Sequence, residues 1–282
     1  MTPFERFVAI DWTGAKGCRH KAIEVAICEA GNTAPVRITP PAKYWSREAV
    51  LEFVKAQAST RTLIGFDFSF APPFADRGCF LANTPAATGT EFWAFVDAAA
   101  TDEDLGASGF IEGGLRPHFY FGSDCGPKAP YLRLRVAEAL LRERKIGTPS
   151  SLFDCIGAGQ VGKGSFAGMR LLHRLRTAEV PVWPFDPKPD TGPLVVEIYP
   201  RTFLRLAGGR GTKLRNGAEL DTALAALGSA PAGLTGPLSD HLTDAIIASA
   251  GLRHIAENPH LWRPAALTPA LARTEGWIFG VS

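Results

Sequence analysis

The amino-acid sequence predicts an α/β fold in which a mixed central sheet is flanked by helices. Two observations predict it. Short apolar runs rich in β-forming residues alternate with segments of helical periodicity. No long polar, Pro/Ser-rich stretch divides the 282 residues, and 46% of them are hydrophobic, enough for a full core. We therefore expect one domain over 1–282, with an insertion over approximately 69–193.

The N-terminal part is predicted to supply most of the sheet. The run from Phe7 to Asp11 predicts a strand that ends in a turn, and alternation predicts two more strands over 21–28 and 34–39. Ser46 is placed to cap a helix, and the apolar run over 62–68 is typical of a strand buried on both faces. Three strands, a helix and a strand are the opening of a ribonuclease H-like fold, with a fifth core strand expected over 193–199.

The segment between the fourth and fifth strands is read as helices and loops packed beside the sheet. Helices are expected over 90–100, 130–145 and 166–175, and a strand over 180–185. The cationic stretch over 130–145 is interpreted as a solvated helix face. Further helices are predicted over 202–206, 217–227 and 240–257, with a short strand or ordered tail over 277–280.

Composition excludes several classes of protein. The formal net charge is only +2, so the sequence lacks the strong basic character typical of many nucleic-acid binders. The five cysteines form no C-x-x-C pair, which argues against a disulfide framework and a thiolate zinc site. No apolar run is long enough for a membrane span and no signal peptide is recognisable, so we expect a cytoplasmic protein.

Carboxylates recur where apolar elements end. Asp11 ends the first strand, Asp67 lies in the fourth and Glu197 in the fifth, while Asp240 and Asp244 share one face of the helix over 240–257. Unpaired buried carboxylates are costly, and hard divalent cations prefer oxygen ligands. The pattern predicts a Mg²⁺ or Mn²⁺ site built from these five residues.

Each carboxylate also has a simpler interpretation. Asp11 could be a turn former, and Asp240 could complement the helix dipole. Glu197 could be paired with Arg201, four residues further on. These alternatives stay open at the level of sequence.

A glycine-rich stretch, G-A-G-Q-V-G-K-G-S over 157–165, resembles a phosphate loop. It fits G-x-x-x-x-G-K, but Gly164 stands where such loops need Ser or Thr to hold magnesium. We interpret it instead as a loop leading into a helix, with backbone N–H groups placed to contact substrate phosphate.

Five motifs together resemble a known family. They are V-A-I-D-W-T-G, I-G-F-D-F-S-F, the glycine-rich stretch, V-V-E-I-Y-P-R and S-D-H-L-T-D-A-I-I-A-S-A, followed by a closing E-G-W-I-F-G. In this order they resemble the bacterial domain-of-unknown-function family of predicted ribonuclease H-like nucleases.

The resemblance implies roles for the acids. Asp11 would be the first-strand carboxylate, Asp67 the fourth-strand one, and Asp244, with Asp240, the helical one. Glu197 matches the family's E-x-Y-P stretch. Ribonuclease H proper has a Glu on its first helix, and neither Glu48 nor Glu52 matches it clearly, so the RuvC-like pattern fits better.

These inferences lead to a predicted function. We expect a divalent-metal-dependent nuclease, a hydrolase acting on nucleic acid, in which Asp11, Asp67 and Asp244 are catalytic. Lys16 or His241 would assist by contacting phosphate or relaying a proton. Lys163 and Arg201 are weaker phosphate candidates.

Two other functions remain open. The stretch D-W-T-G-A-K resembles the phosphate-binding hairpin of the actin and sugar-kinase fold, which would indicate an ATP-dependent phosphotransferase. A non-catalytic binding protein could keep the same fold, with its acids in structural ion pairs.

Overall fold

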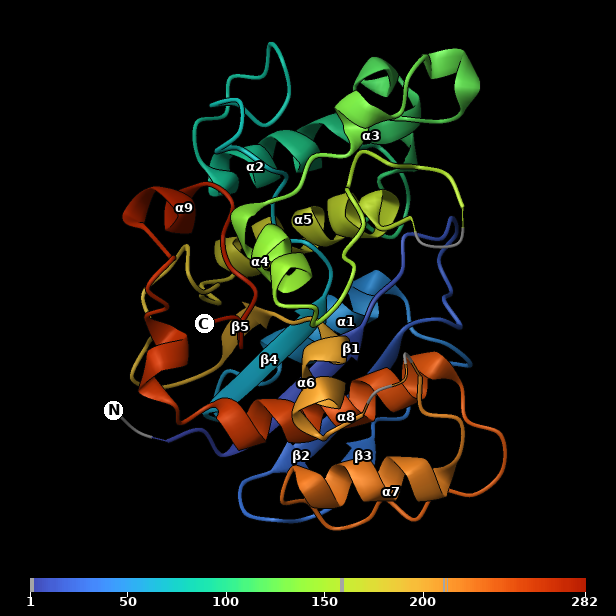
Figure 1. Ribbon diagram of the computed structural model, residues 1–282, viewed down its shortest axis with the longest axis vertical. Helices are drawn as coiled ribbons and strands as arrows, with labels where there is room; N and C mark the ends of the chain where they lie inside the picture. The colour runs from blue at the N-terminus through green and yellow to red at the C-terminus, as the bar shows by residue number, and fades with distance from the viewer. Residues whose placement is uncertain (1–2, 158–159, 210, 212) are drawn as a thin grey trace.

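The protein has an α/β fold with a five-stranded mixed sheet between helices (Figure 1). The computed structural model describes residues 3–157, 160–209, 211 and 213–282. The sheet has the order β3-β2-β1-β4-β5. Its strands are β1 (Arg6–Asp11), β2 (Glu24–Glu29), β3 (Val36–Arg37), β4 (Thr62–Asp67) and β5 (Leu194–Glu197).

Strand direction and register bring three acids to one edge of the sheet. β1 is antiparallel to β2 and parallel to β4, and β4 is parallel to β5. In this register Asp11 lies beside Asp67, and Glu197 lies beside Phe66. Because parallel strands end at the same edge, residues far apart in the sequence meet there.

Helices cover both faces of the sheet. Alternate residues of β1 belong to two apolar cores, Val8 and Ile10 to one and Phe7 and Ala9 to the other. The second core is closed by α8 (Asp240–Ile255), which packs on β1 and β2 and contacts α6 (Pro200–Leu206) and α7 (Gly217–Ala226).

The first core is closed by α1 (Arg47–Lys55) and by α5 (Gly162–Thr177), which packs against α2 (Gly89–Ala99). Shorter helices are α3 (Ser108–Glu112), α4 (Val136–Glu143) and α9 (Pro269–Arg273). Short 3₁₀ turns span Arg116–His118, Ser123–Cys125, Ala129–Tyr131 and Pro259–Trp262.

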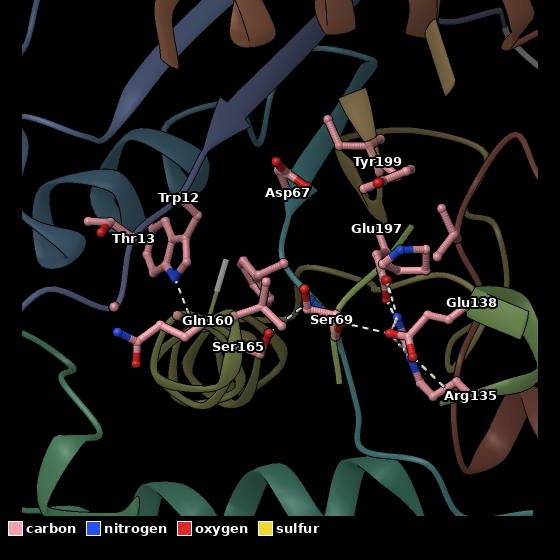
Figure 2. Close-up of a pocket in the computed structure, with 18 of the residues that line it drawn as sticks. Trp12, Thr13, Asp67, Ser69, Arg135, Glu138, Gln160, Ser165, Glu197 and Tyr199 are labelled. Atoms are coloured by element: carbon pink, nitrogen blue, oxygen red, sulfur yellow. Dashed lines mark hydrogen bonds and ion pairs between the residues drawn. The ribbon is translucent and has the colours of Figure 1, made fainter. Parts of the chain in front are cut away.

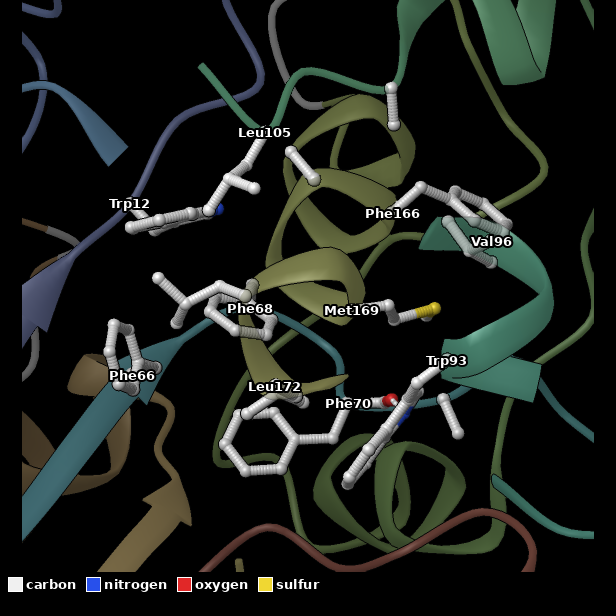
Figure 3. Packing of buried hydrophobic residues seen from close by; sticks show 14 of the residues in the cluster. Trp12, Phe66, Phe68, Phe70, Trp93, Val96, Leu105, Phe166, Met169 and Leu172 are labelled. Carbon is white, nitrogen blue, oxygen red and sulfur yellow. Dashed lines mark hydrogen bonds between the residues drawn. The ribbon is translucent and has the colours of Figure 1, made fainter. Parts of the chain in front are cut away.

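An aromatic row joins the sheet to the segment between β4 and β5. Phe66 lies next to the last residue of β4, and Phe68 and Phe70 follow the strand, with successive ring centroids 5.4 and 5.1 Å apart (Figure 3). Trp93 of α2 donates from Nε1 to the Phe70 carbonyl at 2.6 Å. The long segment after β4 is thereby packed on the sheet rather than left as a free loop.

Several predicted elements differ from those observed. The cationic helix over 130–145 is shorter, because α4 begins at Val136, and Arg135 before it is buried instead of solvated. The expected strand over 34–39 pairs only at Val36 and Arg37.

The predicted strands over 180–185 and 277–280 are each a single bridge to β5, Val182 to Val195 and Ile278 to Glu197. In the glycine-rich stretch, Ala158 and Gly159 lie outside the described residues, and α5 starts at Gly162, earlier than expected. Over the described residues, no helix is long and apolar enough to cross a membrane.

Candidate functional site

Three carboxylates come together at the carboxyl end of β1 and β4. Asp11 is buried at the end of β1, Asp67 ends β4, and Asp244 lies on the second turn of α8, which packs on β1. Burial raises the pKa of Asp11. Burial and then the charges of Asp11 and Asp244 raise the pKa of Asp67 well above its usual range. We call Asp11, Asp67 and Asp244 the carboxylate cluster.

Asp244 shows the same effect from its side. Burial raises its pKa to about 7, with further contributions from the charges of Asp11 and Asp240. The charge of Asp11 raises the pKa values of Asp67 and Asp244, because like charges held close together in a poorly hydrated place disfavour ionisation. The arrangement therefore favours any cation that can neutralise it.

Only one member of the cluster has a side-chain partner. His241 Nδ1 lies 2.5 Å from Asp11 Oδ2, and this contact raises the pKa of His241. Among the described residues, the side chains of Asp67 and Asp244 take part in no hydrogen bond and no ion pair. His241 is half-exposed, so the cation that directly contacts the cluster is open to solvent. The charge of Lys213 acts on Asp244 as well, and lowers its pKa.

Asp240 and Glu197 have ion-pair partners of their own. Asp240, one turn before Asp244, is paired with Lys213. Glu197 is buried, and Arg135 Nη1 donates to its Oε2 at 2.7 Å while a second bond joins Arg135 Nη2 to Oε1. The alternative that Glu197 is paired with Arg201 is therefore wrong. Its partner is Arg135, which is distant in the sequence.

The two carboxylates around Glu197 share one protein cation. Arg135 also donates from Nε and Nη2 to Glu138 Oε1, at 3.0 and 2.9 Å, and the Phe70 N–H donates to Glu197 Oε2 at 2.9 Å. Burial raises the pKa of Glu197, and Arg135 acts against that rise. We call Arg135, Glu138 and Glu197 the arginine network, and all three side chains are buried.

The two lysines expected to contact phosphate share a carboxylate instead. Lys16 Nζ lies 2.9 Å from one oxygen of Glu112, and Lys163 Nζ lies 2.5 Å from the other. Gly14 makes this arrangement possible, since a Cβ there would stand 2.2 Å from the Gly164 nitrogen. The turn after β1 thus sits directly on the start of α5. Arg201 is half-buried on α6.

A cavity of about 410 Å³ opens beside Asp67 (Figure 2). The arginine network lines one side, and His241 also reaches the cavity. Much of the remaining lining is hydroxyl and amide groups, from Ser69, Thr148, Ser150, Gln160, Ser165 and Tyr199. Burial raises the pKa of Tyr199, and so do the charges of Asp67 and Asp244, which places its phenol next to the cluster.

Sequence reasoning missed Arg135, Glu138 and Tyr199. A signal existed for the first two: Glu138 follows Arg135 by three residues at a helix start, where a Glu reaches back to the backbone, and here it accepts from the Arg135 N–H at 2.9 Å. Tyr199 stands in the E-I-Y-P motif but was not singled out, because an aromatic residue after a strand is more often part of a core.

Comparisons with protein-family models, with curated proteins and with solved structures found no match to this chain. The function is therefore inferred from the residues of the site.

In the part of the chain that the structure describes, no group of three or more His, Cys, Asp or Glu side chains stands ready-arranged around a metal position. The cluster offers carboxylate oxygens beside a cavity lined by polar groups. Among the described residues, the carboxylates of Asp67 and Asp244 have no side-chain partner.

Proposed function

We propose that the protein is a divalent-metal-dependent phosphodiesterase that hydrolyses nucleic acid. The observation that carries the proposal is that Asp67 and Asp244 have no cationic partner in the described structure while their charges oppose one another and that of Asp11. A buried group of like charges is costly unless a cation completes it. The motifs that resemble those of predicted ribonuclease H-like nucleases point to the same residues.

The topology supports a ribonuclease H-like assignment. Three antiparallel strands lead into a helix and then into a fourth strand parallel to the first, and the acids lie at the ends of β1 and β4. In this assignment the residues over approximately 69–193 form an insertion between the fourth and fifth core strands.

The residues present suit Mg²⁺ or Mn²⁺, because both favour carboxylate oxygens. Asp11, Asp67 and Asp244 would hold the metal, while Glu197 and Asp240 are engaged by Arg135 and Lys213. When bound, the metal supplies an activated water near neutral pH and charge stabilisation for the phosphate. His241 holds one oxygen of Asp11 and so competes with a cation for that oxygen.

The reaction is a hydrolysis. The oxygen of a water molecule forms a bond to phosphorus, the ester bond between phosphorus and the leaving oxygen breaks, and the proton lost by water is balanced by the proton gained by the leaving oxygen. His241 is placed to hold a proton, since its contact with Asp11 raises its pKa and its ring faces the cavity. We propose that it donates that proton toward the leaving group.

Hydrolysis of bis(4-nitrophenyl) phosphate tests the proposal without assuming any nucleic-acid structure. We expect release of nitrophenol with Mg²⁺ or Mn²⁺ and none in chelator. Ca²⁺ should bind but support little turnover, because its coordination is looser and more variable. Activity that persists in chelator, or no activity with any of these metals, would overturn the proposal and favour a non-catalytic binding protein.

A further inference from the structure

The cavity beside Asp67 differs from a surface that binds a polyanion. Arg135 is the one Lys or Arg side chain among its described lining residues, and Glu138 and Glu197 neutralise it. Lys16 and Lys163 are bound to Glu112 and do not line the cavity. Duplex-binding proteins track the phosphate backbone with rows of free cations, and this cavity offers none.

Its size and its walls suit one neutral, flat group. A volume of about 410 Å³ is in the range of pockets for single small molecules. Trp12 and Tyr199 lie on opposite sides of the cavity, with Asp67 between them in the view of Figure 2. Trp12 is held in place by its Nε1, which donates to the Gly164 carbonyl at 3.0 Å.

The polar lining supplies hydrogen bonds without net charge. Ser69, Ser150 and Ser165 offer hydroxyl groups, and Gln160 offers an amide that can both donate and accept. Aromatic walls with a few hydrogen-bonding groups are the means by which proteins read an unpaired base, by stacking on its face and bonding to its edge.

We propose that the cavity receives one unpaired nucleoside unit of a single-stranded nucleic acid, whose adjoining phosphodiester then faces the carboxylate cluster. This inference rests on the proposed function and adds the substrate class: single strands and unpaired ends, not intact duplex. The bond changes are those of the hydrolysis above. The cavity holds base and sugar, and the metal-loaded carboxylates meet the phosphate.

The test measures binding of a fluorescent single-stranded oligonucleotide in Ca²⁺, where little turnover is expected, against a duplex of the same sequence. We expect the single strand to bind at least about tenfold more tightly, since stacking of an unpaired base contributes substantially to such binding. A nucleoside monophosphate should compete with the single strand. Equal binding of the duplex, or no binding of either, would overturn the inference.

Cavity-filling variants locate the binding. Ser150→Trp should weaken single-strand binding about tenfold or more. If that variant does not fold, Thr148→Trp at the exposed rim should have the same effect. The matched control is Thr177→Trp at the exposed far end of α5, about 20 Å from Gly164 at a rise of 1.5 Å per residue, which should bind as wild type. Wild-type affinity in a folded Ser150→Trp or Thr148→Trp variant would contradict the inference.

Hydrolysis of bis(4-nitrophenyl) phosphate separates the two claims. Metal-dependent hydrolysis of this small ester together with indifference to strandedness would leave the proposed function standing and remove the inference. Absence of hydrolysis together with strand-selective binding in the cavity would remove the proposed function and leave the binding of single strands standing.

Discussion

Two groups of carboxylates lie at the same end of the sheet and differ in the cations that neutralise them. In the arginine network, Arg135 makes bonds to both Glu138 and Glu197, so that the carboxylates have a protein cation. In the carboxylate cluster, the half-exposed His241 contacts Asp11, and the side chains of Asp67 and Asp244 have no ion-pair partner among the described residues. The first group is complete within the chain, whereas the second favours a cation from outside.

The difference separates a structural role from a functional one. The arginine network ties the start of α4 to β5, and Arg135 Nη1 also donates to the Glu275 carbonyl at 3.1 Å near the chain's end. It therefore holds together segments from three parts of the sequence. In the cluster, only the contact between Asp11 and His241 joins two elements among the described residues, β1 and α8. The cost of the cluster to stability is explained if the carboxylates serve chemistry.

The largest expected effect is on activity. Asp11→Asn should lower metal-dependent hydrolysis about a thousandfold, because it removes a carboxylate that we propose holds the metal. Steady-state kinetics with Mn²⁺ measures it. Asp186→Asn, which alters an ion pair with Arg176 at the far end of α5, is the control and should keep wild-type activity. Unchanged activity in Asp11→Asn would place the chemistry elsewhere.

The next effect is on stability and falls on the arginine network. Arg135→Met should lower the free energy of unfolding by about 3–5 kcal/mol, since two buried carboxylates lose their cation. Urea denaturation measures it. Arg176→Met, at an exposed pair, should cost at most about 1 kcal/mol. If the two variants lost the same stability, the ion pairs of Arg135 would not stabilise the fold more than an exposed ion pair does.

The cluster should respond in the opposite sense. In chelator, Asp67→Asn should stabilise the protein by about 1 kcal/mol or more, because it removes one of the mutually repelling charges. Thermal or urea unfolding of the metal-free protein gives the comparison, with Glu197→Gln expected to destabilise. A lower melting temperature for Asp67→Asn would show that its carboxylate makes a required ion pair.

The pH dependence of stability should sharpen the same contrast. Burial raises the pKa of Asp244 to about 7 in the folded protein, from 3.8 for an aspartate in water. The folded protein binds that proton more tightly, so this group's contribution to stability is fully present below pH 3.8 and is lost as pH rises through 7. Metal-free wild type should therefore be less stable at pH 8 than at pH 5, by urea denaturation. Asp244→Asn should reduce that difference in stability. If the difference stayed unchanged, groups other than Asp244 would be its cause.

Much of the fold follows from local pattern. Apolar runs located β1, β4 and β5, and Ser46 caps α1 as expected. Parallel pairing then brings Asp11 and Asp67 together, as their positions at strand ends predicted. Short elements were not predictable, because a single bridge such as Val182 to Val195 depends on tertiary contacts and not on periodicity.

The site was predictable only where the carboxylates end regular elements. The pairing of Glu197 with Arg135 depends on how the segment before α4 returns to the sheet, and no spacing in the sequence specifies that path. Arg135 resembles its cationic neighbours in sequence, yet it is buried while the stretch was expected to be solvated. Burial of a charge depends on its partners, which are distant in the chain.

Calorimetric titration with Mn²⁺ tests most directly the claim that the unpaired cluster binds a cation and the arginine network does not. We predict saturable binding to wild type, loss of binding in Asp67→Asn, and retained binding in Glu197→Gln, measured below its unfolding midpoint. Absence of binding to wild type, or loss in Glu197→Gln with retention in Asp67→Asn, would contradict the account.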